Sequence, residues 1–377
     1  MKGMANAEVS DQLYYSGTQL EAARSAVASA LGCHADEVML NEAAGVGINL
    51  IAHGIEWEAG DVVVTCENEH PSNRVPWYAL AQRRGIEIAT LADEVPGTQL
   101  DDPQPTPNPQ LLADLEELLS SLGPRAKLFS FSHVSRRTGA RLPAQEMCAV
   151  AHRHGVPVLI DGAQAFGSIP VDVKETGCDF YTVNGHKYCM APTGTGACYV
   201  AREKLESVLP SWVGCHGEVP GTDESEDVFE LLPSARRFEF GSRNISDHAG
   251  WRKALEIWRD EVGWENLFAG IADLTGYVKA SLQALDGVKV STPLPYEESS
   301  TIVAFSVDGL HGEEIASWCQ DRNILVAAHL KRAVRISAHV YNTKEEVDQL
   351  VDAVRELQHS MAEAETAAAE KAPAARL

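Results

Sequence analysis

Between residues 18 and 205 the sequence alternates short apolar runs with helical stretches of about 10–15 residues, and this alternation is what most restricts the fold. The run Asp61-Val-Val-Val-Thr65 has no polar alternation, so we expect both faces of that strand to be buried. Such strands, separated by helices, are typical of a mostly parallel sheet covered on both faces. The expected strands are 37–40, 61–65, 86–90, 127–132, 156–161, one near 180 and 197–201; the expected helices are 18–31, 46–55, 73–84, 110–122 and 144–154.

The C-terminal third predicts a second, smaller α/β domain. Residues 206–246 are irregular and rich in Gly, Pro and acidic side chains, which suits a loop over a site. After them we expect helices at 247–264, 268–285, 313–321 and 343–357, and strands at 301–307, 324–327 and 333–337. We therefore expect an α/β protein with a large domain at 15–246, a small C-terminal domain at 247–361 and a low-complexity tail at 362–377 that frays or stays disordered.

The overall charge narrows the possible partners. Lys+Arg number 31 against 54 Asp+Glu, a net charge of -23. Such a field repels nucleic acid and anionic lipid, so we expect neither nucleic acid nor a membrane as a partner. Residues 1–12 lack a basic region followed by an apolar core, and no apolar run approaches the roughly 18 residues that span a bilayer. We expect a cytoplasmic enzyme.

The eight cysteines form no Cys-x-x-Cys pair, and their spacing suits neither a zinc site nor a small disulfide scaffold. Reduced thiols, mostly buried, are the simplest interpretation. We expect no metal site.

Three polar segments end or follow predicted strands, where ligands bind in open α/β sheets. One strand ends at Asp161, a second leads to Lys187, and Glu67 to Trp77 form a loop that opens a helix. Taken singly, a lysine there is usually a surface residue and an aspartate a helix cap. Together they meet the needs of pyridoxal phosphate, which requires a lysine, a carboxylate for its pyridine nitrogen and a flat side chain over its ring.

With these segments the sequence resembles the class V, cysteine desulfurase-like family of aminotransferase-fold enzymes that use pyridoxal 5'-phosphate. The resemblance covers residues 18–358 and rests on motifs in the family's order: Glu-His-Pro-Ser-Asn (69–73), Ser-His-Val-Ser (132–135), Asp-Gly-Ala-Gln (161–164), Gly-His-Lys (185–187), Phe-Glu-Phe-Gly-Ser (238–242) and Arg-Ile-Ser-Ala-His-Val-Tyr-Asn-Thr (335–343). It implies fold type I, the fold of pyridoxal-phosphate-dependent transferases.

The resemblance also implies roles for single residues. Lys187 is the lysine that binds the cofactor as a Schiff base, Asp161 pairs with the pyridine nitrogen, Gln164 bonds the ring oxygen and His70 stacks on the ring. Other positions, listed here, contact the phosphate or the substrate: His186, Asn184, Ala44, Gly45 and Ser242 for the phosphate, and Arg335 and Asn244 for the substrate. Ser242 stands where the family's contact comes from the partner subunit, which implies a homodimer with shared active sites.

Several positions depart from the family. Ala44 and Gly45 replace two threonines of the phosphate loop, so only backbone N–H groups of the helix N-terminus stay available there. Arg136 and Arg137 stand near an asparagine of many members, and they are either substrate-recognition cations or surface charges. True desulfurases carry a mobile cysteine shortly before the arginine strand, whereas the connection from Val326 to Arg335 has none. Cys215 lies in the irregular segment that could line the site.

Two reactions fit this build. The first is β-elimination by a C–S lyase on cystine or an S-substituted cysteine, which we favour because Glu69-His-Pro, Thr138-Gly and Arg237-Phe-Glu are similar to those of cystine lyases. The second is epimerisation, because the Tyr341-Asn-Thr element is similar to that of isopenicillin N epimerase-like members. A catalytically silent binding protein of the same fold is the alternative from another class. A small amino acid is the expected substrate.

Overall fold

The computed structural model describes residues 18–94, 108–219, 229–328 and 332–371. These residues group into two compact units, the first made of residues 18–93, 108–136, 142–219 and 229–268, and the second of residues 94, 137–141, 269–328 and 332–371. The described part of the first unit holds the large sheet and that of the second a smaller sheet. The domain boundary expected at residue 246 stays a prediction, since compactness alone does not define a domain.

The first unit is built on a seven-stranded sheet of order β1-β7-β6-β5-β4-β2-β3. The strands from β3 to β6 along this order are parallel, and β7 is antiparallel to both β6 and β1. This confirms the expected mostly parallel sheet. The strands are β1 Val38–Asn41, β2 Val62–Cys66, β3 Glu87–Leu91, β4 Ala126–Ser132, β5 Val158–Asp161, β6 Phe180–Asn184 and β7 Gly196–Val200.

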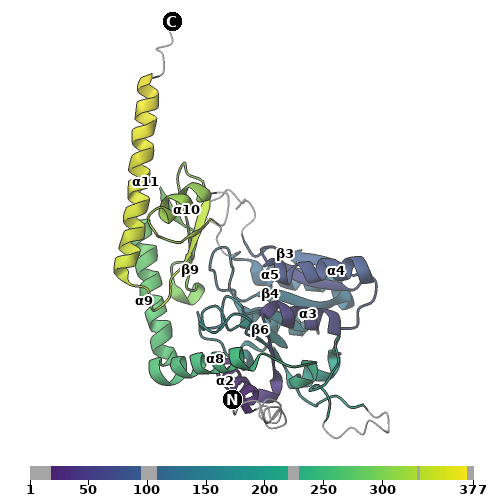
Figure 1. The fold of residues 1–377 in the computed structure, drawn as a ribbon. Coiled ribbons are helices and arrows are strands. Elements are labelled where there is room, and N and C mark those ends of the chain that lie inside the picture. The colour runs from purple at the N-terminus through teal and green to yellow at the C-terminus, as the bar shows by residue number, and fades with distance from the viewer. Residues whose placement is uncertain (1–17, 95–107, 220–228, 329–331, 372–377) are drawn as a thin grey trace, which may run out of the picture. The chain divides into compact units, whose positions relative to one another are not determined.

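Because side chains alternate along a strand, the two faces of the sheet contribute side chains to two separate hydrophobic cores. Phe129 and Phe131 belong to one, and Leu128, the residue before Phe129, to the other. The first core includes residues of α2 (Thr18–Leu31), α5 (Leu111–Leu122), α6 (Ala144–Arg153) and α8 (Ile245–Glu256), and the second residues of α3 (Ala44–Gly54) and α4 (Val75–Arg84). Figure 1 labels α2, α3, α4, α5 and α8 among these helices.

The second unit contains a four-stranded antiparallel sheet of order β10-β11-β9-β8. Its strands are β8 Val288–Val290, β9 Ile302–Val307, β10 Ala327–Ala328 and β11 Ala333–Ser337. Its core joins β9 to α9 (Trp264–Gln283, which starts in the first unit), α10 (Gly312–Gln320) and α11 (Lys344–Lys371). Short elements are α7 Val173–Thr176, η1 Ala35–Glu37, η2 Pro71–Asn73, η3 Gly123–Arg125, η4 Arg202–Ser207, η5 Ala235–Phe238, η6 Ile257–Val262 and η7 Tyr296–Glu298.

Three expectations were wrong in detail. The strand expected at 324–327 is found only at Ala327–Ala328, and the helix expected at 247–264 ends at Glu256 and continues as the π-helical η6. The tail, expected to fray from residue 362, continues α11 to Lys371, because alanine and glutamate are strong helix formers. Residues 101–107 of the proline-rich loop and 372–377 of the tail lie outside the described residues.

None of the described helices is long and apolar enough to span a membrane.

Candidate active site

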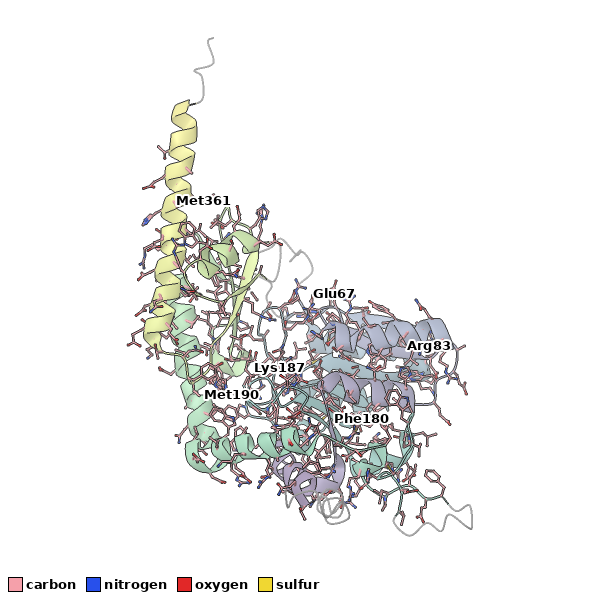
Figure 2. All side chains as sticks on the ribbon, viewed as in Figure 1. Glu67, Arg83, Phe180, Lys187, Met190 and Met361 are labelled. Atoms are coloured by element: carbon pink, nitrogen blue, oxygen red, sulfur yellow. The ribbon has the colours of Figure 1, made fainter. Side chains whose placement is uncertain are left out.

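The carboxyl ends of three neighbouring strands of the first unit carry the polar residues of the candidate site. Ser132, the last residue of β4, is in register with Asp161, the last residue of β5, and Asp161 is in register with Thr182 on β6. Two residues further on, β6 ends at Asn184, and the loop after it carries Lys187. Figure 2 labels Lys187 after this strand and Phe180 at its beginning. The parallel direction of β4, β5 and β6 therefore brings these groups to one edge of the sheet.

Asp161 is a buried carboxylate next to positive charge. Its side chain is 5% exposed and accepts a hydrogen bond from the Ala163 backbone N–H at 2.9 Å. Burial raises its pKa, while that hydrogen bond and the charges of Lys187 and His70 act in the opposite direction. Three of the predicted site residues therefore lie close enough to interact electrostatically.

His70 is held by the turn that follows it. It caps η2, and its Nδ1 accepts a hydrogen bond from the Ser72 backbone N–H at 3.1 Å. Because Nδ1 accepts, a neutral His70 ring carries its proton on Nε2. Pro71, at the first position of η2, fixes the backbone after the ring. The orientation of His70 is thus set locally.

The start of α3 meets the end of β6. The Ala44 backbone N–H donates to Oδ1 of the buried Asn184 at 2.8 Å. A Cβ added to Gly45 would lie 3.5 Å from Cβ and 3.6 Å from Oγ of Ser72. The Ser72 hydroxyl is therefore near the helix N-terminus, where the family's threonines are missing. Ser72 could not be assigned to this group from the sequence, because its spatial neighbour Gly45 is 27 positions away.

The loops after β5 and β6 are tied together. The Tyr188 hydroxyl donates to Oε1 of Gln164 at 3.0 Å, and Nδ1 of His186 lies 3.2 Å from the Thr195 carbonyl oxygen. Because a carbonyl only accepts, Nδ1 of His186 carries a proton. Its Nε2 can then donate to an anion only when the ring is positively charged.

Glu69 is the main site residue that the sequence analysis did not assign. It is 2% exposed and accepts hydrogen bonds from Ser132 and Asn73. Burial raises its pKa to about 8, and the charge of Asp161 adds to the increase, although the hydrogen bonds act against it. The sequence offered one indication of a role for Glu69, which is that this carboxyl group directly precedes His70, the histidine expected to stack on the ring.

Two of the other predicted residues are near α8. Asn244 caps α8 by accepting from the Asp247 backbone N–H at 3.3 Å, and its amide donates to Oδ2 of Asp247 at 2.6 Å. Ser242 lines a pocket with Arg24, Arg236 and Arg243 among others. The structure gives Asn244 a capping role; the predicted substrate contact of Asn244 and phosphate contact of Ser242 stay predictions.

The predicted arginines divide between the units. Arg136 belongs to the first unit, and Arg137 to the second, where its guanidinium forms an ion pair with Glu94 at 3.5 Å. Arg335 lies on β11 of the second unit. The role of Arg335 toward the substrate therefore stays a prediction.

Cys215, in the first unit, is exposed. No group of three or more potential metal ligands occurs among the described residues.

The sheet with its polar edge is that of a fold type I enzyme, and comparison with known proteins identifies the family. The aminotransferase class-V family model matches residues 1–350, and the chain belongs to this family. A probable cysteine desulfurase of Xylella fastidiosa is 30% identical over 93% of this chain and 83% of its own length. Isopenicillin N epimerase of Streptomyces clavuligerus is 30% identical over 88% of this chain and 83% of its own.

A solved structure has the same fold. A cystine C–S lyase in complex with its reaction product, cysteine persulfide, matches with a TM-score of 0.81 and 24% identity, over 92% of this chain and 88% of that one. The expected fold class is thereby confirmed. Enzymes of the class V family use pyridoxal 5'-phosphate, which confirms the expected cofactor at the level of the family.

The residues of this chain fit that cofactor. Asp161 is buried, its pKa is raised by that burial, and a protonated pyridine nitrogen would supply the cation that stabilises its charge. The N-terminus of α3, an 11-residue helix with no acidic residue in its first turn, suits a phosphate. Lys187 and His70, near Asp161, provide the amine and the flat ring.

Proposed function

We propose that this chain is a C–S lyase that performs β-elimination on cystine or an S-substituted cysteine. With cystine, one C–S bond breaks and one water is consumed, giving cysteine persulfide, pyruvate and ammonia. An S-substituted cysteine gives a thiol in place of the persulfide. The reaction needs no thiol on the enzyme, because the sulfur leaves with the substrate's own substituent.

The missing cysteine carries this proposal. The sequence from Val326 to Arg335 contains no cysteine, so nothing in that connection can take sulfur from the substrate. The preceding cysteine, Cys319, is buried on α10, and burial raises the pKa of its thiol. A thiol held protonated in a packed core is a poor nucleophile. Transfer of sulfur through an enzyme persulfide, as in a desulfurase, is therefore disfavoured.

Each residue then has a defined task. Pyridoxal phosphate, when bound, withdraws electrons from the Cα of an attached amino acid. Lys187 binds the cofactor and later moves the proton at Cα, Asp161 holds the pyridine nitrogen and His70 covers the ring. Gln164, held by Tyr188, faces the ring oxygen. The start of α3, Asn184 and His186 surround the phosphate.

The substrate side involves the remaining predicted residues. Arg335 clamps the α-carboxylate, for which a planar guanidinium suits better than an ammonium. Arg136 and Asn244 contact the rest of a small amino-acid substrate. The enzyme works in the cytoplasm as a homodimer, in which Ser242 of each subunit reaches the phosphate bound by the other.

Product analysis tests the proposal. The protein, supplied with pyridoxal phosphate, is incubated with cystine and a series of S-substituted cysteines, and pyruvate and sulfur products are measured. We expect pyruvate in equal amount to the thiol or persulfide, and none from Lys187→Ala. Alanine formed together with a protein-bound persulfide would instead identify a desulfurase.

Epimerisation is the second candidate, supported by the Streptomyces clavuligerus epimerase among the relatives and by the Tyr341-Asn342-Thr343 element. Exchange of deuterium at Cα with racemisation and without pyruvate would establish it. A catalytically silent binding protein would give neither product. A violet absorption band that is lost in Lys187→Ala would separate a silent protein that still binds the cofactor from one that does not.

A further inference from the structure

Glu69 joins the loop that carries His70 to the end of β4. Its Oε1 accepts a hydrogen bond from the Ser132 backbone N–H at 2.7 Å. Its Oε2 accepts from the Ser132 hydroxyl at 2.6 Å and from the Asn73 amide at 2.8 Å. The Ser130 hydroxyl donates to Oδ1 of Asn73 at 2.7 Å, so the network reaches a second residue of β4. Both ends of the His70 turn are therefore attached to the sheet.

These donors are all neutral, which leaves a charge on Glu69 without a hydrogen-bonded cation. The titratable groups that face it are Asp161 on β5, Cys66 on β2 and His70 beside it. Asp161 raises the pKa of Glu69, and the charge of Glu69 raises that of Cys66 in turn. Asp161 has Lys187 and His70 near it. Two buried carboxyl groups that interact electrostatically do not both ionise readily, and the one beside the cations ionises first.

We propose that Glu69 is a positioning residue that fixes the His70 turn against β4 and carries a proton, so that Asp161 alone is charged. A protonated Oε2 donates to the Ser132 hydroxyl while Oε1 still accepts from the Ser132 N–H. Asp161 then holds the single negative charge that a pyridine nitrogen requires. This inference rests on the roles of His70 and Asp161 in the proposed function.

Glu69→Gln is the informative variant, because glutamine has the shape and charge of protonated glutamate. Its amide oxygen can accept from the Ser132 N–H and its amide nitrogen can donate to the Ser132 hydroxyl, whereas the bond from the Asn73 amide is kept only if that amide turns its oxygen toward the new NH2 group. Glu69→Asp keeps the carboxyl group but withdraws it by one methylene, which breaks contacts on one side of the network. Glu67→Gln, an exposed glutamate of the same loop that Figure 2 labels, is the matched control.

The first measurement is the infrared band of protonated carboxyl groups in the full-length protein at pH 7, with and without added pyridoxal phosphate. The second is the absorption band of the bound cofactor between pH 6 and 9. We expect Glu69→Gln to lose one protonated carboxyl and the part of the absorption titration centred near pH 8, where the pKa of Glu69 lies. Its kcat should stay within about threefold of the wild type, and that of Glu69→Asp should fall about tenfold with a smaller change in KM.

The outcomes separate this inference from the proposed function. The same carboxyl band and titration in Glu69→Gln and the wild type, or a kcat of Glu69→Asp equal to that of the wild type, would overturn it. If the wild type forms no violet band but loses a protonated carboxyl on Glu69→Gln, the proposed function fails and the protonation of Glu69 stands. If Glu69→Asp does not fold, the infrared comparison with Glu69→Gln and Glu67→Gln decides alone.

Discussion

The backbone N–H of Ala44 donates a hydrogen bond to the side-chain oxygen of Asn184, 2.8 Å away, and so joins the start of α3 to the end of β6. Both residues are buried, and both were predicted to contact the cofactor phosphate. Since Asn184 satisfies the Ala44 N–H, it also sets where the helix N-terminus stands relative to the Lys187 loop.

Asn184→Ala should therefore lower both the free energy of unfolding and the affinity for the cofactor. It leaves the buried Ala44 N–H without its acceptor, at a cost of about 1–3 kcal/mol in the free energy of unfolding. Urea unfolding and a pyridoxal phosphate titration measure the two effects. Asn49→Ala, at an exposed position of the same helix, should leave both unchanged. Equal stability of the two variants would contradict this prediction.

Ser72→Ala should weaken cofactor binding without destabilising the fold. Its hydroxyl is the side-chain donor beside Gly45, and the Ser72 backbone N–H, which holds His70, stays in place. We expect the Kd for pyridoxal phosphate to rise about tenfold or more, which corresponds to the roughly 1.5–3 kcal/mol of one hydrogen bond to a charged group. The double variant Ser72→Ala/Ala44→Thr, which restores a hydroxyl, should recover part of the loss. An unchanged Kd in Ser72→Ala would show that the hydroxyl does not contact the phosphate.

The strands and the cofactor group were predictable because their signals are local. The strand ending at Asp161 is a continuous apolar run, and the polar residues follow the strand ends directly. Burial on both faces produces this pattern, so its presence predicts the sheet. The prediction of a strand at 324–327 was wrong in its bounds. β10 is a two-residue edge strand with both residues exposed, and in an exposed strand an apolar run does not indicate burial on both faces.

The role of Glu69 was not predictable, because its partner Ser132 lies 63 positions away. Their contact depends on β2 and β4 being neighbours, which follows from the strand order and not from either segment alone. The clustering of Ser72 with Gly45 likewise joins two segments that are far apart in the sequence.

The pH dependence of stability should change in Glu69→Gln. The pKa of Glu69 in the folded protein, about 8, lies above its ordinary value of 4.5, so the folded state holds this proton more tightly. The stabilisation that this tighter proton binding adds to the folded state is fully present below about pH 4.5 and is lost as the pH rises to about 8. Between these values Glu69 lowers the free energy of unfolding by at most about 1.4 kcal/mol per pH unit.

Urea unfolding at several pH values between 5 and 8 tests this. The slope of the free energy of unfolding against pH should be more negative in the wild type than in Glu69→Gln, and Glu67→Gln should follow the wild type. Parallel profiles of the wild type and Glu69→Gln would show that Glu69 is ionised throughout.

Removal of one partner of the buried ion pair between Arg24 and Glu239 should strongly destabilise the first unit. Nη1 lies 2.6 Å from Oε1 and Nη2 3.1 Å from Oε2, and Oε1 also accepts from the Leu40 N–H at 2.7 Å. Burial alone would raise the pKa of Glu239, but the charge of Arg24 holds it below its ordinary value. Glu239→Gln leaves the guanidinium buried without a full counter-charge, which should cost about 3–5 kcal/mol.

An exposed pair provides the control for this comparison. Arg125 and Glu87 are 2.9 Å apart but 49% and 61% exposed, so Glu87→Gln should cost less than about 1 kcal/mol. The double variant Arg24→Met/Glu239→Leu should lose less than the sum of its single variants, since neither charge is left alone. Similar losses for Glu239→Gln and Glu87→Gln in urea unfolding would contradict the prediction.

Cys215 offers the sharpest test of whether sulfur passes through the enzyme. It is the only one of the eight cysteines that is exposed; six are buried, and Cys33 is half-buried. It is therefore the one thiol accessible enough to attack a substrate. In the proposed lyase Cys215→Ser should form pyruvate at a rate within about twofold of the wild type. A loss of a hundredfold or more, together with a persulfide on Cys215 in the wild type, would mean that this loop supplies the nucleophile that the connection before Arg335 lacks.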